Sequence, residues 1–540
     1  MENKRLKLPI GIQTFERLRT EGYVYVDKTH YLVNLIDSGA IYFLARPRRF
    51  GKSLTTSTFE ALFTGKKELF KGLYAEEFLN RPDFKPSPVI RLDMSEITTD
   101  EGIGVVRESL LNLTRNVANN LGVELSNTQL AGDLLSELIT STAKKYNQKV
   151  VILLDEYDKP YTDFMNDPDM TEKVRNVLRN YYVRIKAKDA FIRFTFITGI
   201  SKFAKFGVFS TLNTPLDISM MPKYAEMCGY TEEEIIRYFP EYLKETANEM
   251  QISIPKLIEK MRDYYNGFTF DSKTETSVYN PFSTLSFFEK KEFSNIWVQS
   301  GKPKLIADYL KNRHLTVEQF RNYPVTVDFV ESPGDMDITP PEGFLYQSGY
   351  LTLRKLTNGS LALDYPNTEV LNAMSKLVAE NIFQGKGENY MYYSQRLFAA
   401  LENNNQDLFT GTLNMLLASI PYDDFSKAAE QKVIINNYKF PAQEWLYRSC
   451  ILSFLRGCGV VVDAELHSHL GRADLVISYF GRTWVIEIKV AYEGQSAEKK
   501  AEEAYRQIID NQYAKPYPNA ICLGLGIDNE SRQIASSFQF

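Results

Sequence analysis

The segment Arg46-Pro-Arg-Arg-Phe-Gly-Lys-Ser53 contains the side chains best suited to bind phosphate. It follows a short apolar run, as a phosphate-binding loop follows a strand. Gly51 lets the backbone approach a phosphate closely, Lys52 supplies a positive charge for the β- and γ-phosphates, and the Ser53 hydroxyl is a ligand for Mg²⁺. A helix expected over residues 54–62 would add free N–H groups at its positive end. This pattern predicts a nucleotide site that uses Mg²⁺.

The arginines of this loop leave a second interpretation open. Arg46 occupies the position of the first glycine in the pattern G-x-x-x-x-G-K-S, so the loop could be a basic turn that contains Gly-Lys-Ser by chance. Arg46, Arg48, Arg49 and Lys52 lie close together without an acidic residue among them. One guanidinium group can bind two phosphate oxygens at once, whereas in a basic turn the guanidinium groups would lie in solvent. We favour phosphate binding because a second motif supports it.

An acidic pair supplies that second motif. Asp155 and Glu156 follow the apolar run 150–154, where an ATPase holds its Mg²⁺-linked aspartate and the glutamate that activates water. Thr198 ends another apolar run and could sense the γ-phosphate or simply cap a helix, and Asp158 could be a solvated turn residue. The predicted nucleotide-binding residues are Arg46, Arg48, Arg49, Gly51, Lys52, Ser53, Asp155 and Thr198, with Ser53 and Asp155 as Mg²⁺ ligands and Glu156 as the catalytic base.

A second candidate site lies near the C-terminus. Asp474 is in a strand-like segment that the turn at residues 480–482 joins to a second strand, residues 483–490. Because side chains alternate along a strand, Glu487 and Lys489 point the same way. Asp474 and Glu487 could chelate Mg²⁺ or Mn²⁺, and Lys489 could orient the attacking water or stabilise the charge of the transition state of phosphodiester cleavage. The alternative is a cross-strand salt bridge on a solvated sheet face.

Neighbouring elements extend this site. An upstream helix carries Glu444, so the predicted metal ligands are Glu444, Asp474 and Glu487, and the predicted catalytic residues are Asp474, Glu487 and Lys489. A downstream helix carries Gln507 and Tyr513, with Lys500 and Arg506 nearby for backbone phosphates. Glu465 is an alternative acidic ligand and His467 and His469 could assist, although exposed positions are also expected for these three residues.

The elements that would position both sites follow from the apolar pattern. Short apolar runs at residues 41–45, 89–92, 150–154 and 194–198 alternate with helical patterns, which is typical of a doubly wound α/β domain with a parallel sheet. We expect a phosphate-loop domain over residues 1–230 and a helical lid or connector over 231–435. A small α/β domain over 436–540 would contain a helix at 443–455, three strands and a helix at 497–513.

Composition narrows the functional class. The chain has 540 residues, 63 Lys plus Arg against 68 Asp plus Glu, and a formal charge of −5, so contact with nucleic acid must come from local basic patches. Its four cysteines form no C-x-x-C pair and it has four histidines, which argues against a zinc cage or a disulfide framework. No signal peptide or membrane span is predicted. We expect a soluble, cytoplasmic protein.

At the level of motifs, the chain resembles the AAA-ATPase-like proteins of bacteria that carry a C-terminal nuclease domain of the PD-(D/E)XK superfamily, and the resemblance covers nearly the whole chain. The matching stretches are Tyr25-Val-Asp27-Lys28-Thr29, Arg46-Pro-Arg-Arg-Phe-Gly-Lys-Ser53, Asp155-Glu-Tyr-Asp-Lys-Pro160, Thr198-Gly199, Leu212-Asn213, Tyr265-Asn-Gly267, Tyr279-Asn-Pro281, Glu444, Gly471-Arg-Ala-Asp474, Glu487-Ile-Lys489 and Gln507. The family shares the arginine in place of the first loop glycine. The resemblance implies Mg²⁺-dependent ATP binding and a metal-dependent nuclease fold.

Three functional hypotheses follow. The first is a two-headed enzyme that binds and hydrolyses ATP with Mg²⁺ and cuts DNA or RNA with Mg²⁺ or Mn²⁺. The second is an ATP-driven conformational switch whose nuclease-like domain only binds nucleic acid or a partner protein. The third is a transporter-like or signalling ATPase without nucleic acid. No membrane partner is expected, and a homo-oligomer could supply an arginine finger, for which Arg193 and Arg237 are candidates.

Overall fold

The computed structural model describes residues 5–99, 102–164, 167–200, 215–297, 317–326, 341–382, 387–418, 433–435, 438–440, 442–468, 471–479 and 481–537. Contacts between residues group the chain into two units. Unit 1 comprises Met1–Ile296 and Asn322–Thr368, and unit 2 comprises Trp297–Arg321 and Glu369–Phe540. Within the described ranges, no helix is both long enough and apolar enough to cross a membrane.

Unit 1 contains a parallel five-stranded sheet. Its strands are β1 (Ile41–Ala45), β2 (Val89–Asp93), β3 (Val150–Asp155), β4 (Ile192–Gly199) and β5 (Leu216–Asp217), in the spatial order β2-β3-β4-β1-β5. All neighbouring strands are parallel, and the four predicted runs are all strands. β4 lies between β1 and β3 in the sheet. Because the strands are parallel, the carboxyl ends of β1, β3 and β4 meet at one edge of the sheet.

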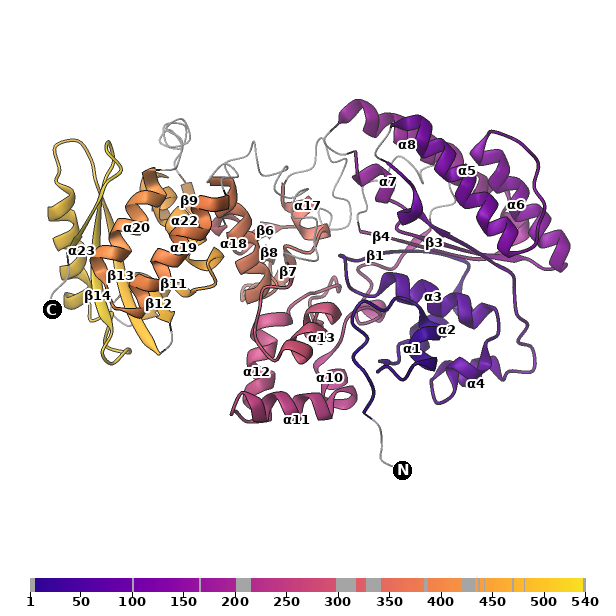
Figure 1. The fold of residues 1–540 in the computed structure, drawn as a ribbon, viewed down its shortest axis with the longest axis horizontal. Coiled ribbons are helices and arrows are strands. Elements are labelled where there is room, and N and C mark those ends of the chain that lie inside the picture. Colours follow the sequence, from indigo (N-terminus) through magenta and orange to yellow (C-terminus); the bar gives the residue numbers. More distant parts are fainter. Residues whose placement is uncertain are drawn as a thin grey trace. The chain divides into compact units, whose positions relative to one another are not determined.

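Helices cover both faces of this sheet (Figure 1). One face carries α3 (Lys52–Phe63), and the other carries α5 (Ile103–Asn120), α6 (Ala131–Tyr146) and α8 (Pro168–Ala187). Phe59 of α3 lies with its ring 5.3 Å from that of Phe194 and 4.8 Å from that of Phe196. Because side chains alternate along β4, Ile197 instead joins the apolar core on the opposite face. The predicted doubly wound parallel fold is therefore confirmed.

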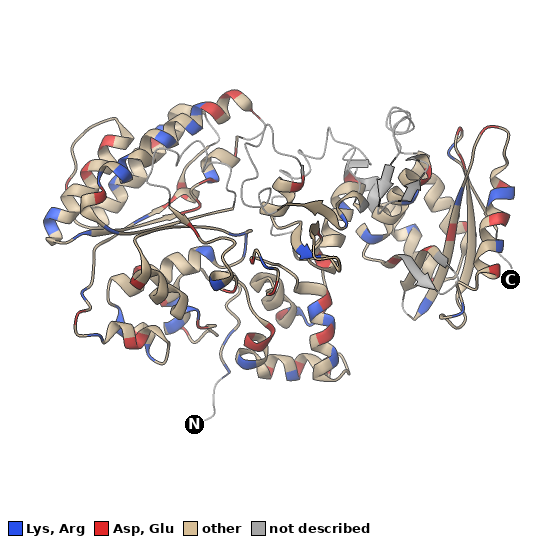
Figure 2. Ribbon diagram, turned by 180° about the vertical axis from the view of Figure 1, so that it is seen from behind, with Lys and Arg blue, Asp and Glu red and all other residues tan. Residues whose placement is uncertain are grey.

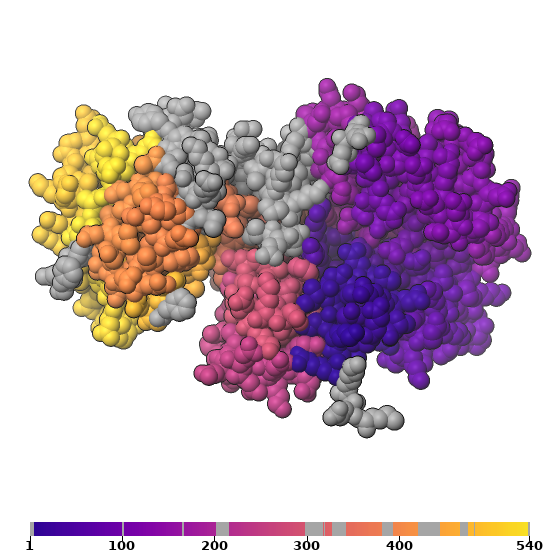
Figure 3. Space-filling model, viewed as in Figure 1, coloured from indigo at the N-terminus to yellow at the C-terminus, as the bar shows by residue number. Residues whose placement is uncertain are grey.

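Further helices complete unit 1 around the sheet. They are α1 (Phe15–Thr20), α2 (Thr29–Ser38), α4 (Ala75–Leu79), α7 (Lys159–Thr162), α10 (Glu232–Tyr238), α11 (Pro240–Glu249), α12 (Ile254–Tyr265), α13 (Pro281–Lys290) and α17 (Pro341–Gln347). Helices α10–α13 share a core with Val24 and Val26 of the N-terminal segment, and the indigo segment lies against these magenta helices in Figure 3. Short 3-10 helices of unit 1 occur at Lys67–Phe70, Met94–Glu96, Asp189–Phe191 and Pro222–Tyr224, whereas the one at Glu318–Phe320 belongs to unit 2.

The middle of the chain differs from the helical connector predicted over residues 231–435. It contains an antiparallel three-stranded sheet, with β6 (Tyr323–Val325), β7 (Thr352–Lys355) and β8 (Leu361–Asp364) in the order β6-β8-β7. These strands have three or four residues each, which is too short for a clear alternating pattern. The region is also divided between the two units, because α10–α13 and this sheet belong to unit 1 while residues 369–435 belong to unit 2.

Unit 2 is built on a mixed five-stranded sheet. Its strands are β11 (Val461–Ser468), β12 (Gly471–Tyr479), β13 (Arg482–Ala491), β14 (Ile521–Asp528) and β15 (Ile534–Ser537), in that spatial order. β13 and β14 pair in parallel and the other neighbours pair antiparallel. The helices are α18 (Thr368–Ile382, whose first residue belongs to unit 1), α19 (Gly387–Glu402), α20 (Gln406–Ala418), α22 (Ala442–Gly457) and α23 (Ala497–Asp510), and β9 (Val433–Ile435) pairs with β10 (Tyr438–Phe440).

The core of unit 2 extends beyond the predicted boundary at residues 435/436. Leu397 of α19 and Leu413 of α20 belong to the same apolar cluster as the C-terminal sheet, and the ring of Phe409 lies 5.2 Å from that of Trp484. Periodicity indicates that a helix buries one face but does not identify what covers that face. The small α/β domain predicted over residues 436–540 therefore shares its core with helices that were assigned to the connector.

Candidate nucleotide-binding and metal-binding sites

The predicted phosphate-binding loop joins β1 to α3 in a conformation that requires glycine. Gly51 precedes the helix with φ of 91° and ψ of 19°, in the left-handed region that side chains other than glycine rarely adopt. Lys52 is the first helical residue and its side chain is buried. Its ammonium donates to the carbonyl oxygens of Arg46, at 2.9 Å, and Pro47, at 3.0 Å. A phosphate would compete with these two carbonyls for the same donors.

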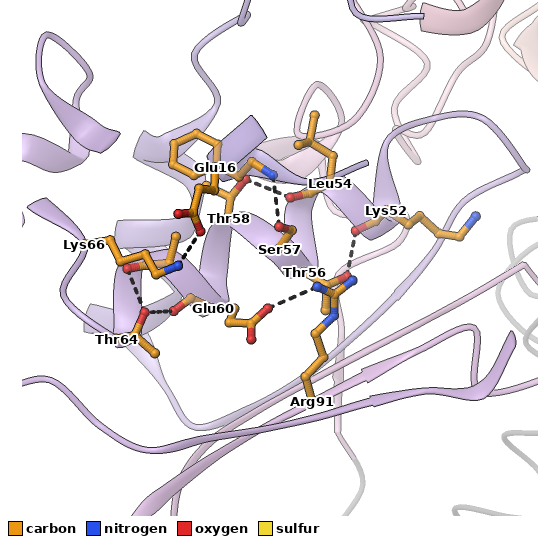
Figure 4. Close-up of polar contacts among 12 residues, drawn as sticks. Glu16, Lys52, Leu54, Thr56, Ser57, Thr58, Glu60, Thr64, Lys66 and Arg91 are labelled. Atoms are coloured by element: carbon orange, nitrogen blue, oxygen red, sulfur yellow. Dashed lines mark hydrogen bonds and ion pairs between the residues drawn. The ribbon is translucent and has the colours of Figure 1, made fainter. Parts of the chain in front are cut away.

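Hydroxyl groups fix the first turns of α3 (Figure 4). Thr56 donates to the carbonyl oxygen of Lys52 at 2.8 Å, and Thr58 donates to that of Leu54 at 2.8 Å. Ser57 instead accepts the backbone N–H of Phe15 at 3.0 Å, which ties the helix to α1. An ion pair between Glu60 and Arg91 joins the helix to β2. These contacts hold the N-terminus of α3, where Ser53 lies half-buried.

The buried carboxylate at the end of β3 has one oxygen without a partner. Asp155 is fully buried, and its Oδ1 accepts the hydroxyl of Thr198 and, at 3.2 Å, the N–H of Glu156. Oδ2 has no hydrogen-bond partner among the described residues. Burying a carboxylate oxygen without a partner is costly, so this atom suits a ligand that completes the site. Mg²⁺ or one of its waters fits that position, and Thr198 orients the carboxylate instead of being an isolated helix cap.

Electrostatics link the loop to the acidic strand end. Burial raises the pKa of Glu156, while the positive charges of Lys52 and Arg48 oppose that rise. Burial lowers the pKa of Lys52, and the charges of Glu156, Asp155 and Asp158 oppose that change. The five side chains therefore share one electrostatic environment, in which the surrounding charges influence the pKa of Lys52 and of Glu156. The structure brings the predicted lysine, aspartate and glutamate together.

Asp158 could have been a solvated turn residue, but the structure buries it. It is 1% exposed, and its carboxylate accepts the N–H of Ile200, with 3.1 Å from Oδ2 and 3.3 Å from Oδ1. Gly199 makes this contact possible, because a Cβ there would lie 2.4 Å from the ring of Tyr157 and 2.8 Å from Asp158. The second aspartate of the Asp155-Glu-Tyr-Asp158 run was the available signal, and sequence reasoning underrated it.

Arg46 has a structural role in place of the expected phosphate contact. Its guanidinium is 1% exposed and donates to the carbonyl oxygens of Ala45, Ser219 and Tyr224 at 2.9, 2.7 and 3.1 Å. It also lies 4.2 Å from the centroid of the Phe270 ring. A cation held by three carbonyls and an aromatic face anchors the loop to the segment after β5, which explains why an arginine can replace the first glycine of the standard pattern.

Aromatic rings from the middle of the chain frame the rest of the loop. Phe50 is buried, with its ring 4.9 Å from that of Phe268 and 5.2 Å from that of Phe270. The guanidinium of Arg49 lies 4.1 Å from the centroid of the Phe282 ring. These rings directly follow the two family motifs that carry no chemistry of their own, Tyr265-Asn-Gly267 and Tyr279-Asn-Pro281. Of the four cations of the loop, Lys52 and Arg48 remain those near Glu156.

A cavity that sequence reasoning missed lies beside the loop. It is lined by one side of α3, the N-terminal segment and residues 227–230, namely Pro9, Leu18, Val24, Tyr25, Val26, Lys28, Leu32, Phe50, Gly51, Leu54, Thr55, Thr58, Met227, Cys228, Gly229, Tyr230 and Pro281. Lys28 forms an ion pair with Glu234 of the capping box that starts α10. Apolar walls next to a phosphate-binding loop suit the base of a nucleotide.

The second site forms where β12 and β13 separate. The two strands pair from Tyr479 and Arg482 to Leu475 and Ile486. Beyond this pair, hydrogen bonds between side chains and backbone replace the backbone-to-backbone hydrogen bonds of the two strands. Asp474 Oδ2 accepts the N–H of Ile488 at 2.8 Å, and the N–H of Asp474 donates to Glu487 Oε2 at 3.2 Å. The two carboxylates predicted to act together are therefore adjacent.

Close packing of α23 on β14 completes this site. Gly524 and Gly526 are next to Glu487 and Lys489 in the sheet. A Cβ on Gly524 would lie 2.2 Å from the carbonyl oxygen of Ala501, so only glycine lets the helix approach this closely. Two side-chain contacts involve residues at the C-terminal end of α23 and just after it. Gln507 donates to Glu487 Oε1, and Asn511 donates to the hydroxyl of Tyr513 at 2.9 Å.

Burial and neighbouring charges shift the pKa of the carboxylates at this site. Burial and the charge of Asp474 raise the pKa of Glu487 to about 8, and the charges of Lys489 and Arg448 oppose that rise. The same causes raise the pKa of Glu444. A divalent cation would add positive charge beside two adjacent carboxylates, so the residues fit Mg²⁺ or Mn²⁺. Lys489 is half-buried beside the carboxylates.

The predicted three-carboxylate ligand set is not assembled. Among the residues that the structure describes, no group of three His, Cys, Asp or Glu side chains is placed to hold a metal ion. Glu444 shares the electrostatic environment of Asp474 without joining it as a ligand. Instead, Arg448, one turn further along α22, forms an ion pair with Asp474 Oδ1 at 3.2 Å. Sequence reasoning missed Arg448, because a single arginine on a helix carries no pattern.

The remaining candidates have local partners or lie outside the described residues. Lys500 pairs with Glu503 and Arg506 with Glu502 along α23, where both signs of charge alternate (Figure 2). Arg193 donates to the carbonyl oxygen of Lys85 and to Ser87, while Arg237 is exposed. The side chains of Glu465 and His467, the whole of His469, and Leu212-Asn213 are not among the described residues.

Comparison with known proteins matches two regions of the chain to known families. A family model described as "Predicted AAA-ATPase" matches residues 9–209, and one described as "PD-(D/E)XK nuclease superfamily" matches residues 442–537. An Azotobacter chroococcum mcd 1 protein, "Uncharacterized protein in vnfD 5'region", is 32% identical over 529 residues, which are 95% of this chain and 94% of that protein. The crystal structure of Cdc6p from Pyrobaculum aerophilum matches with a TM-score of 0.26 and 10% identity, over 65% of this chain and 91% of that one.

Fold and sites together define a phosphate-loop ATPase-like unit joined in one chain to a nuclease-superfamily unit. The chain belongs to the AAA-ATPase-like family whose members carry a C-terminal PD-(D/E)XK nuclease-superfamily domain.

Proposed function

We propose that this protein binds and hydrolyses ATP with Mg²⁺ in unit 1 and cleaves nucleic acid with Mg²⁺ or Mn²⁺ in unit 2. One observation carries the proposal for unit 1. Lys52, Asp155 and Glu156 share one electrostatic environment at the carboxyl edge of the sheet, and Asp155 Oδ2 has no partner among the described residues. This is the arrangement that phosphoryl transfer needs, because positioning and charge supply most of its catalysis. The apolar cavity beside the loop would hold the base.

The chain's own residues would divide the work as follows. Lys52 exchanges its two backbone carbonyls for phosphate oxygens, and Arg48 adds a second positive charge. Ser53 and Asp155 would hold Mg²⁺, which neutralises charge on the phosphates when it is bound. Thr198 keeps the Asp155 carboxylate oriented through its hydrogen bond. Glu156 accepts the proton of the attacking water, and its raised pKa brings it closer to the working pH of a general base.

Separating ATP binding from hydrolysis tests this assignment. E156Q keeps the shape of the side chain and loses the base, so ATP affinity should be retained while turnover falls by about 10²–10⁴-fold. The matched control is E172Q, which changes an exposed glutamate of the same unit. Binding is measured with a fluorescent ATP analogue and turnover by phosphate release. Hydrolysis by E156Q at the parent rate would remove Glu156 from the mechanism.

A specific observation favours the second activity. Asp474 and Glu487 meet where two strands separate. The Asp474 carboxylate accepts a backbone N–H from the strand of Glu487, and the Glu487 carboxylate accepts the backbone N–H of Asp474. Both would hold the metal ion, which polarises the phosphate when it is bound. Gln507 fixes one oxygen of Glu487 through its amide. Lys489, next to the pair and unable to act as a ligand while charged, would orient water or stabilise the transition state.

A cleavage assay separates the enzyme from the binding switch. Plasmid, single-stranded DNA and RNA are incubated with the full chain, with and without ATP, in Mg²⁺ and in Mn²⁺. D474N should abolish cleavage, whereas D463N, which changes an exposed aspartate of β11, should leave it unchanged. If the parent cuts nothing but its affinity for nucleic acid changes with ATP, unit 2 is a binding module and the alternative of an ATP-driven switch replaces the nuclease.

A further inference from the structure

The two carboxylates of unit 2 have every oxygen engaged by the protein itself. Asp474 Oδ2 accepts the N–H of Ile488, and Oδ1 accepts the guanidinium of Arg448. Glu487 Oε2 accepts the N–H of Asp474, and Oε1 accepts the amide of Gln507. Three of these donors are neutral N–H groups. Arg448 is the cation of the four, at the atom where a metal ion would bind.

The ion pair is partly buried and comes from a fixed element. The side chain of Arg448 is 14% exposed and that of Asp474 is 18% exposed, so both are largely shielded from solvent but keep some exposed surface. Arg448 lies on α22, whose neighbouring residues Tyr447, Cys450 and Ile451 are buried in the core of unit 2. This packing holds the helix against the core, so the side chain of Arg448 is the part expected to move.

Two cations cannot share one oxygen of Asp474. Like charges at contact distance repel strongly in a partly buried site, because solvent screens them poorly. A divalent ion at Oδ1 therefore requires the guanidinium to leave. An anion that enters the site would attract the guanidinium of Arg448 away from Asp474. A phosphodiester is such an anion, since its two non-bridging oxygens match a guanidinium in a bidentate contact.

We propose that Arg448 is a built-in counter-ion that closes the metal site of unit 2 until a nucleic-acid phosphate draws its guanidinium away. This inference rests on the proposed metal-dependent function of unit 2. Arg448 is a positioning residue in this scheme, because it acts through Asp474. By linkage, the phosphodiester and the metal ion raise each other's affinity by the same factor. The site would thus stay empty of metal in the absence of nucleic acid.

Mn²⁺ titration calorimetry on the full chain tests the inference without using activity. R448A and R448Q should each bind Mn²⁺ at least about tenfold more tightly than the parent, since the competing charge is gone. R482A is the matched control, because Arg482 is an exposed arginine of the same unit, and it should bind like the parent. Adding D474N to each protein identifies the heat that belongs to this site. R448Q retains the length of the side chain and guards against a folding defect in R448A.

The second arm adds a short DNA duplex or its RNA counterpart. Nucleic acid should tighten Mn²⁺ binding in the parent and leave that of R448Q nearly unchanged. Equal Mn²⁺ affinity of parent, R448A and R448Q would overturn the inference while leaving the metal site and the proposed nuclease standing. Absence of Mn²⁺ binding in all of them, with or without nucleic acid, would overturn both. Tighter Mn²⁺ binding by R448A but not by R448Q would also contradict the inference. Both variants remove the positive charge, so the smaller side chain of R448A would then be the cause.

Discussion

The two candidate sites treat their charged atoms in opposite ways. In unit 1 the cation Lys52 is satisfied by backbone carbonyls, and the carboxylate Asp155 keeps an oxygen that has no partner among the described residues. In unit 2 both oxygens of Asp474 and both oxygens of Glu487 accept hydrogen bonds, one of them from a cation. The first site gains contacts when a ligand enters, whereas the second must exchange a contact that it already has.

This contrast predicts that the two sites bind their ligands under different conditions. A site with an unsatisfied buried oxygen favours its ligand over the ligand-free state, because the ligand removes a desolvation cost. A site whose oxygens are saturated binds only a ligand that comes with a new partner for the displaced group. We therefore expect Mg²⁺ and ATP to bind unit 1 readily, and a metal ion to bind unit 2 conditionally.

The largest expected effect concerns the loop lysine. K52A removes the charge that would contact the β- and γ-phosphates, so ATP affinity should fall by about one to two decades, corresponding to roughly 1.5–3 kcal/mol for a charged hydrogen bond. K66A, which removes a more exposed lysine after the same helix, should leave ATP affinity unchanged. Titration with a fluorescent ATP analogue measures both. Equal affinities of K52A and the parent would mean that the loop does not bind phosphate.

The next effect tests the packing that shapes unit 2. G524A places a Cβ 2.2 Å from the carbonyl oxygen of Ala501 and 2.4 Å from the backbone N of Tyr505, so backbone must move and stability should fall by about 1–3 kcal/mol. G411A is the control, since a Cβ on this glycine of α20 meets nothing closer than 4.0 Å. Urea denaturation compares the variants. A G524A protein as stable as the parent would show that α23 can withdraw freely.

A smaller effect should distinguish the arginines of the loop. R48A should weaken ATP binding by up to about tenfold, because Arg48 contributes positive charge beside Glu156. R49A should change affinity little, since its guanidinium rests on the Phe282 ring at an exposed position. The same fluorescence titration ranks the two variants. A larger loss from R49A than from R48A would reverse the assignment of the phosphate-facing arginine.

The smallest effect is a dependence of stability on pH. The pKa of Glu487 is about 8, above its ordinary value of 4.5, because of burial and the charge of Asp474. A carboxyl group whose pKa is raised by folding stabilises the fold while protonated, so this contribution is complete below about pH 4.5 and is lost as the pH rises to about 8. With a chelator present, the melting temperature of the parent should fall by a few degrees from pH 5 to pH 8 relative to E487Q. Parallel pH profiles of the two proteins would contradict the raised pKa.

The sequence predicted the elements whose signal is local. Short apolar runs identified β1–β4, and alternation along one strand placed Glu487 and Lys489 on a common face. It missed β14, because Gly524 and Gly526 weaken the strand pattern, although the same glycines admit α23. It also missed Arg448 and the role of Arg46, because both depend on partners far away in the chain. A single charged residue that contacts a distant part of the chain produces no periodic pattern in the sequence.

The rings around the phosphate loop determine how long a segment of the chain must be to keep the packing of the loop. The family match to the ATPase-like part ends at residue 209, yet Phe50 is only 1% exposed because Phe268 and Phe270 cover it. A fragment that ends near residue 230 would retain the loop and expose that ring to water. Recombination within this family would keep these contacts around the loop only when the break falls beyond Phe282.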